Sequence, residues 1–263
     1  TMSVEMGETI ITFEVPKSKT FAGLRQVKNR IQTAVFDSIG IAITRQCTAQ
    51  CEMCCFECGP DKKEELDKEL IFRIIDEAAE IEEIKKIGFT GGEATLRDKV
   101  LIEGIERTKL RGMEATLTSN GFWGKEPENA RSWMKRLKAA GLDLLTLSLD
   151  EYHQKYIPLG SIRNIIRANE DTRIRITLAV GDSLGEQDSA AILRELGEDA
   201  YEHPLFLYPF MPVGRGKNLN KVSLKKVNEN WSCHNQKMLS VLYNGNVYPC
   251  CSQAVYGSLL CEA

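Results

Sequence analysis

From Ser38 onward, the sequence alternates short apolar runs of β type with longer segments of helical periodicity. This alternation implies an α/β fold built on a parallel sheet, because helices connect successive parallel strands. We expect about six βα units, short of the eight that close a full barrel. The expected strands run over Ile39 to Thr44, Lys86 to Thr90, Glu114 to Thr118, Leu144 to Leu149, Arg173 to Val180 and Leu205 to Phe210.

The segments between these strands have the apolar periodicity of helices. In the first of them, apolar residues recur three and four positions apart, at Leu70, Ile71, Ile74, Ile75 and Ala78. This spacing produces one apolar stripe that can pack against the sheet. The expected helices cover Leu66 to Ile81, Asp98 to Leu110, Pro127 to Ala140, Ser161 to Asn169 and Glu186 to Leu196.

The two ends of the chain follow other patterns. Thr9 to Val15 alternates like a strand, and Phe21 to Ile31 resembles an amphipathic helix that could cap the core or bind a partner. Near the C-terminus, Asn244-Gly245 separates two β-type runs, which is a strong hairpin signal. The sequence therefore predicts three parts: an N-terminal extension over 1–37, an α/β region over 38–227, and a small hairpin appendage over 228–263.

The charge balance bears on possible partners. The chain has 34 basic and 37 acidic residues, a formal net charge of −3, so no global cationic field would attract a nucleic acid or an anionic membrane. No apolar run approaches the roughly 20 residues that a membrane span needs, and the first residues lack the layout of a signal peptide. We expect a cytoplasmic protein with neither nucleic acid nor membrane as partner.

The cysteines are the most unusual feature of the composition. Nine are present, and they fall into two groups, the first with Cys47, Cys51, Cys54, Cys55 and Cys58 and the second with Cys233, Cys250, Cys251 and Cys261. The chain length, the odd number and the missing signal peptide favour metal-binding or reactive thiols over disulfides.

The first group contains a CxxxCxxC motif directly after the first expected strand. Its members Cys47, Cys51 and Cys54 can hold three irons, whereas an iron–sulfur cube ordinarily takes four thiolates. One iron would therefore stay open for a substrate or cofactor, which suggests catalysis. A structural zinc site is the alternative, but zinc ribbons usually pair two CxxC arms, and this loop has no partner arm.

With these motifs the chain resembles the radical S-adenosylmethionine (SAM) enzymes from about Ser38 to its C-terminus. CxxxCxΦC is their signature, and here Met53 occupies the apolar Φ position, which contacts the adenine in relatives. Gly91-Gly92-Glu93 resembles their GGE motif, which holds the SAM amino group. The glycines permit close backbone approach, and Glu93 can accept charge-assisted hydrogen bonds. The resemblance implies a partial (β/α)6 TIM-like barrel, a SAM-binding [4Fe–4S] cluster on the CxxxCxxC cysteines, and SAM itself.

Further polar residues follow the expected strands. Asn120, Ser148 and Asp150 match positions where relatives contact polar groups of SAM, and they fall at strand carboxyl ends, where α/β folds gather ligands. Asn120 in a simple turn and Asp150 as a helix cap are the alternatives. Arg215, in a Gly-rich segment after the sixth strand, could reach the SAM carboxylate.

The second cysteine group resembles an auxiliary-cluster region. Cys233, Gly245 and Cys250 fit the CxₙGx₄C opening of the SPASM or twitch domain seen in many radical SAM enzymes that act on peptides. Cys261 is a candidate further ligand, or else an exposed tail thiol. Because full SPASM domains continue with more cysteines, the auxiliary site is either abbreviated or continued beyond this sequence.

Cys250 and Cys251 are adjacent, so on an extended segment their side chains point in opposite directions. With Cys250 as a ligand, Cys251 would be a free thiol, for which plain packing is the alternative to a role in the reaction. The stretches CCFECGP, SNGFWG, SLDEYH and YPCCSQA are similar to those of YydG-type peptide epimerases.

This likeness implies conversion of L- to D-residues in a ribosomally made precursor peptide. The 5′-deoxyadenosyl radical would remove an α-hydrogen, and Cys251 would return a hydrogen from the opposite face. A reductant such as flavodoxin or ferredoxin is implied as a further partner. The rival interpretations are a radical SAM peptide crosslinker and a non-catalytic iron–sulfur or zinc module. No physical argument assigns a role to Cys55 or Cys58.

Overall fold

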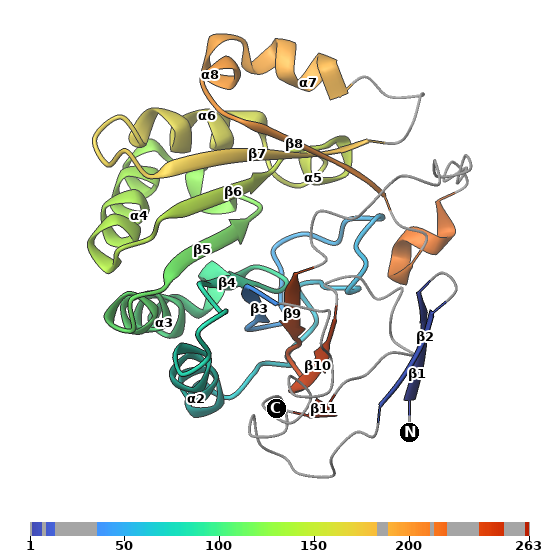
Figure 1. Cartoon of the computed structure of the whole chain (residues 1–263). Helices are drawn as coiled ribbons and strands as arrows, with labels where there is room; N and C mark the ends of the chain where they lie inside the picture. The colour runs from blue at the N-terminus through green and yellow to red at the C-terminus, as the bar shows by residue number, and fades with distance from the viewer. Residues whose placement is uncertain are drawn as a thin grey trace.

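The computed structural model describes residues 2–6, 9–13, 36–182, 189–210, 213–219, 237–249 and 261–262. Its main element is a sheet with the strand order β11-β10-β9-β3-β4-β5-β6-β7-β8 (Figure 1). Strands β3 to β8 are parallel and follow one another in chain order. The strands are β3 (Ser38–Ala42), β4 (Lys86–Thr90), β5 (Glu114–Ser119), β6 (Leu144–Ser148), β7 (Arg175–Asp182), β8 (Leu205–Pro209), β9 (Met238–Val241), β10 (Asn246–Tyr248) and β11 (Cys261–Glu262).

Helices alternate with these strands and gather on one side of the curved sheet (Figure 1). Local signals set their ends: Asp67 caps the first helix by accepting from the Leu70 amide, and Gly141 ends another in a left-handed conformation. The α-helices are α2 (Lys68–Ala79), α3 (Asp98–Leu110), α4 (Pro127–Ala140), α5 (Glu151–Gln154), α6 (Leu159–Ala168), α7 (Ser189–Leu196) and α8 (Glu198–Tyr201). Short 3₁₀ helices are η1 (Ala94–Arg97), η2 (Phe122–Gly124) and η3 (Gly214–Asn218).

The core lies between the sheet and these helices. Alternate residues of β4 and β6 are buried, among them Ile87, Phe89 and Leu147, and they meet the apolar stripes of the helices. The intervening residues, such as Thr116 and Thr146, are small or polar and only partly buried. The sheet thus has one apolar face and one polar face, and the polar face is available to a site.

The expected α/β architecture is confirmed. The six predicted strands correspond to β3 to β8, and five predicted helices correspond to α2, α3, α4, α6 and α7, with ends displaced by a few residues. The structure adds α5 and α8, whose four residues each are too short for a periodic signal. In the described residues the sheet ends at β8 and β11, so it is not closed into a barrel.

The predicted C-terminal hairpin is present and joins the main sheet. β9 and β10 are antiparallel, and Gly245 in the turn has φ +81°, as a tight hairpin turn requires. β9 also pairs in parallel with β3, with Ile39 opposite Leu239. The hairpin therefore extends the main sheet and lies beside the strand that leads into the CxxxCxxC motif.

At the N-terminus, the expected strand corresponds to β2 (Thr9–Phe13), which pairs antiparallel with β1 (Met2–Met6). The helix expected over Phe21 to Ile31 lies outside the described residues. The three-part division of the chain stays a prediction. Among the described residues, no helix combines the length and apolarity needed to cross a membrane.

Replacing Leu117 by Ala tests the packing of the central sheet. Leu117 on β5 is 1% exposed, so we expect the variant to lose about 2–5 kcal/mol of unfolding free energy through lost burial and an unfilled cavity. Denaturant unfolding measures this loss. Its neighbour Thr118 faces the other side of the sheet and is exposed, so Thr118→Ala should change stability by less than about 0.5 kcal/mol. Equal effects of both substitutions would contradict the assigned register.

Candidate functional site

The candidate site lies where the parallel strands end. After β3, residues 46–59 form a loop, here called the cysteine loop, which contains the CxxxCxxC motif. Gln46 forms a parallel bridge with Gly59, and the amide of Cys47 donates to the Gly59 carbonyl at 3.1 Å. The loop is thus closed at its base, beside the end of β4, where Gly91 and Gly92 lie.

The thiols of the cysteine loop are largely removed from solvent. Cys47, Cys51 and Cys58 are 8%, 5% and 3% exposed. They form one cluster with the rings of Tyr152 and Phe210, against which Met53 and Cys54 also pack. The loop therefore brings the three motif cysteines and Met53 together, as the sequence predicted.

Burial and neighbouring thiols set the acidity of these groups. Burial raises the pKa of both Cys47 and Cys51 to about 12, and the charges of neighbouring thiols act in the same direction. The pKa of Cys54 is lowered to about 6, chiefly by a hydrogen bond from Cys58. The thiols thus lie close enough to influence one another.

This donor set fits an iron–sulfur cluster held by three cysteines. The motif thiols share one loop and one buried cluster, and a metal that binds them as thiolates would offset the cost of burying their charge. In the described part of the chain, no three His, Cys, Asp or Glu side chains already converge as a metal site. The cysteine side chains would therefore have to reorient on binding.

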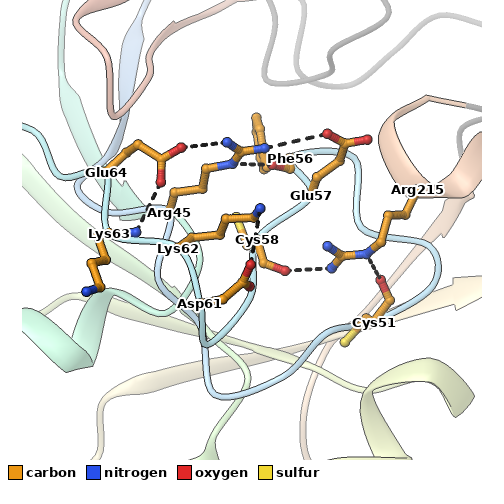
Figure 2. Close-up of polar contacts among 10 residues, drawn as sticks. All are labelled: Arg45, Cys51, Phe56, Glu57, Cys58, Asp61, Lys62, Lys63, Glu64 and Arg215. Atoms are coloured by element: carbon orange, nitrogen blue, oxygen red, sulfur yellow. Dashed lines mark hydrogen bonds and ion pairs between the residues drawn. The ribbon is translucent and has the colours of Figure 1, made fainter.

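Two arginines hold the cysteine loop from outside (Figure 2). The Nε of Arg45 donates to the carbonyl oxygen of Phe56 at 3.2 Å, and its guanidinium pairs with Glu57 and Glu64. Arg215 on η3 donates from Nε to the Cys51 carbonyl at 2.9 Å and from Nη2 to the Cys58 carbonyl at 2.6 Å. The sequence suggested that Arg215 reaches the SAM carboxylate; the structure instead places its guanidinium on the cysteine loop.

Gly91 and Gly92 lie very close to the backbone at the start of the cysteine loop. The Gly92 amide donates to the Thr44 carbonyl at 2.7 Å. A Cβ atom added to Gly92 would lie 2.1 Å from the carbonyl oxygen of Gln46, and one added to Gly91, where φ is +138°, would lie 2.4 Å from that of Thr44. Only glycine fits at either position. Whether the same backbone also binds a ligand stays a prediction.

Glu93 is 1% exposed and is surrounded by donors. Its carboxylate accepts from the amide and hydroxyl of Thr95 at 3.2 and 2.7 Å, from the hydroxyl of Ser119 at 3.0 and 3.1 Å, and from the amide of Asn120 at 2.8 Å. Burial raises its pKa, and these hydrogen bonds oppose the increase. Because its acceptor sites are filled from within the protein, the geometry supports a role in joining β4, η1 and the end of β5. Direct contact with an ammonium would require a donor to move.

Asn120 connects this network to the cysteine loop. Its Nδ2 lies 3.6 Å from the Cys47 sulfur and 3.2 Å from the Thr48 hydroxyl, and its Oδ1 accepts from the Phe122 amide at 3.0 Å. The next residue, Gly121, has φ +75°, so the turn suggested by the sequence is present. Asn120 and Cys47 are in contact although 73 positions separate them in the sequence.

Asp150 caps α5 and anchors a second buried network. Its Oδ1 accepts from the amides of Tyr152 and His153, each at 3.0 Å, which confirms the helix-cap alternative. Its Oδ2 lies 2.7 Å from Nδ1 of His153 and accepts from the Tyr208 hydroxyl at 3.0 Å. Burial lowers the pKa of His153, but the hydrogen bond and charge of Asp150 outweigh it, so the net shift is upward. Direct contact between Asp150 and SAM stays a prediction.

The remaining predicted residues are placed only in part. Ser148 ends β6, opposite Ala179 of β7, and is partly buried. Cys233, Cys250 and Cys251 lie outside the described residues, and for Cys261 the structure describes the backbone of β11 alone. The auxiliary ligands and the proposed hydrogen donor therefore stay predictions.

Arg45 and Tyr208 contribute to the site although the sequence did not indicate it. Arg45 stands two positions before Cys47, yet a single arginine has no motif that marks it. Tyr208 lies on β8 in an apolar run, two strands from β6 in the sheet, and its hydroxyl reaches Asp150, which follows β6. No signal in the sequence indicated the tertiary partner of either residue.

Exchange of Glu93 for Gln tests the buried network. The amide nitrogen would replace an oxygen that now accepts hydrogen bonds, leaving a donor facing other donors, so we expect a loss of about 1–3 kcal/mol in unfolding free energy. Thermal and denaturant unfolding measure the loss. The exposed Glu126, which makes no cap hydrogen bond, provides the matched control, and Glu126→Gln should behave like the parent. A parent-like Glu93→Gln protein would show that the network is not needed for stability.

Gly92→Ala tests the close approach of β4 to the cysteine loop. The added methyl meets backbone atoms, which cannot rotate away, so we expect a loss of about 1–3 kcal/mol or more. Gly160, on α6, has no atom within 4 Å of an added Cβ, so Gly160→Ala should leave stability unchanged or raise it by about 0.5–1 kcal/mol. Calorimetric melting temperatures distinguish the two. A Gly92→Ala protein as stable as Gly160→Ala would refute the contact.

Comparisons with known proteins identify a family and relatives for this chain. The family model described as the radical SAM superfamily matches residues 41–179, from β3 to β7. The putative peptide biosynthesis protein YydG of Bacillus subtilis (strain 168) is 31% identical over 229 residues, which are 83% of this chain and 70% of that protein. The tungsten-containing aldehyde ferredoxin oxidoreductase cofactor-modifying protein of Pyrococcus furiosus is 30% identical over 125 residues, 46% of this chain and 33% of that protein.

Solved structures share the fold at low identity. The structure of anSMEcpe with bound AdoMet is 18% identical, with a TM-score of 0.61 over 86% of this chain and 77% of that one. Methylornithine synthase (PylB) is 15% identical, with a TM-score of 0.51 over 82% and 64% of the two chains. The matched family and the three-cysteine loop assign a [4Fe–4S] cluster and SAM as cofactors. The chain belongs to the radical SAM superfamily.

Proposed function

We propose that this radical SAM enzyme modifies a ribosomally made peptide and that the modification is epimerisation of L- to D-residues. The observation that carries the proposal is the similarity to the peptide biosynthesis protein YydG, which extends over 83% of this chain. That similarity reaches well beyond the 41–179 segment matched by the superfamily model. It therefore includes parts of the chain outside the shared SAM-binding region.

In the proposed site, the protein holds both cofactors at the carboxyl ends of the strands. Cys47, Cys51 and Cys54 would bind three irons and leave the fourth for SAM. When bound, the cluster and SAM supply a 5′-deoxyadenosyl radical able to abstract a hydrogen atom. The residues proposed to contact SAM are Met53, Gly91, Gly92, Asn120, Ser148 and Asp150, while Glu93 would fix the backbone around them.

Among these residues, Asn120 contacts the cysteine loop directly through its side chain. Its amide contacts both Cys47 and Thr48 on the cysteine loop, so it would keep the strand end and the cluster loop at a constant separation. Asp150 would hold α5 and β8 together in the same way, because it caps α5 and accepts a hydrogen bond from Tyr208 on β8. Rigid placement of both ends orients a bound substrate toward the radical.

The proposed donor for inversion is the thiol of Cys251. After the α-hydrogen leaves one face of the peptide residue, the S–H bond of Cys251 breaks and a new C–H bond forms on the opposite face. One electron from an external reductant such as flavodoxin or ferredoxin, with one proton from water, would then restore the thiol. Cys233, Cys250 and Cys261 are proposed ligands of an auxiliary cluster, in a C-terminal region over 228–263.

A reaction in deuterated water tests the epimerase function. The reconstituted enzyme, reductant, SAM and a candidate precursor peptide are incubated without oxygen, and cofactor and peptide are analysed by mass spectrometry. We expect 5′-deoxyadenosine and a peptide heavier by one deuterium, because a thiol exchanges its hydrogen with solvent. Chiral analysis after hydrolysis should find the deuterium on a D-residue.

Cys251→Ala should abolish inversion while 5′-deoxyadenosine still forms. Replacement of Cys55, which is outside the CxxxCxxC motif, provides a cysteine control that should keep inversion. A peptide that loses two hydrogens would establish the crosslinking alternative. Absence of 5′-deoxyadenosine from enzyme with full iron content would overturn both catalytic proposals.

A further inference from the structure

Arg215 contacts the cysteine loop through both its side chain and its backbone. Its guanidinium donates to the carbonyl oxygens of Cys51 and Cys58 at 2.9 and 2.6 Å (Figure 2). Its backbone amide donates to the carbonyl of Cys54 at 3.1 Å. One residue thus holds the loop at three points, two of which belong to proposed cluster ligands.

The segment around Arg215 is shaped for this contact. Gly214 has φ +56°, and a Cβ added there would lie 2.3 Å from the carbonyl oxygen of Cys55. Gly216, on the other side, is buried. The close packing of η3 on the loop therefore needs glycine at position 214.

The two arginines on the loop differ in charge compensation. Arg45 pairs with the carboxylates of Glu64 at 2.6 Å and Glu57 at 3.5 Å. Within the residues that the structure describes, Arg215 forms no such pair, and its Nε and Nη2 donate to neutral carbonyls. Among the described residues, no carboxylate therefore compensates this charge, which lies beside buried thiols, where the low dielectric strengthens electrostatic interactions.

We propose that Arg215 is a positioning residue that fixes the cysteine loop and, through its charge, raises the reduction potential of the cluster held there. One-electron reduction makes the cluster more negative, and a nearby cation stabilises the reduced form relative to the oxidised form. The proposal rests on the superfamily assignment and not on the proposed peptide chemistry, so the failure of one leaves the other standing.

Redox titration of the reconstituted enzyme without SAM, followed by electron paramagnetic resonance, tests the proposal. Arg215→Gln retains an amide donor but removes the charge, and we expect its equilibrium constant for reduction to fall about tenfold, which is about 59 mV for one electron. Arg215→Lys retains the charge but not the planar fork, and its potential should stay near that of the parent. The control Arg45→Gln removes a charge that is already paired, so its shift should be smaller than that of Arg215→Gln.

Iron content and melting temperature are measured for each variant. Arg215→Lys should load iron, and failure to do so in a protein that melts like the parent would overturn the charge role. An unchanged potential in Arg215→Gln, or equal shifts in both Arg215 variants, would overturn it as well. If Arg215→Gln does not load iron, Arg215→Lys is compared with Arg45→Gln instead. A reduction potential of Arg215→Lys near that of the parent supports the proposal. A potential shift in Arg215→Lys larger than that in Arg45→Gln refutes it. If Arg215 served only the SAM carboxylate, Arg215→Gln would weaken SAM binding without changing the SAM-free potential.

Discussion

The buried carboxylate of Glu93 is the interaction on which the geometry of the site depends. It accepts hydrogen bonds from Thr95 on η1 and from Ser119 and Asn120 at the end of β5. A buried carboxylate is costly unless donors surround it, so the ends of β4 and β5 must stay where they are for Glu93 to be satisfied. Asn120 extends this constraint to Cys47. The cysteine loop is thereby tied to the parallel sheet.

The cysteine loop is held largely through its backbone. Carbonyl oxygens of Cys51, Cys54, Phe56 and Cys58 accept from two arginines far apart in the sequence. Contacts of this kind leave the thiols themselves available to a metal. They also explain why the loop needs no regular secondary structure, since side chains and backbone donors from elsewhere satisfy its buried polar groups. In radical SAM chemistry, a loop fixed this way would hold the backbone of its three cysteine ligands in position.

Some features of the site were visible in the sequence because they depend on residues close together. The CxxxCxxC spacing places Cys47, Cys51 and Cys54 on one loop, and Gly91-Gly92 marks a close backbone approach. Other contacts were not visible in the sequence. Arg215, suggested as a contact of SAM, donates to the carbonyl oxygens of Cys51 and Cys58. The hairpin around Gly245 joins the main sheet, because β9 pairs with β3. Both contacts join residues more than 150 positions apart, and local patterns do not encode contacts of that kind.

The sequence by itself determined the order of strands and helices, the parallel sheet and the cluster motif. Periodicity and residue spacing act over a few residues, so they can be seen without the fold. Only the tertiary structure decided which polar groups satisfy one another. Glu93 is occupied by internal donors, Asp150 joins His153 and Tyr208, and Arg215 clamps the loop, because the curved sheet and its connections bring these residues together. Hydrogen bonds of buried groups are settled by three-dimensional neighbours, and a linear pattern contains no record of which neighbours those will be.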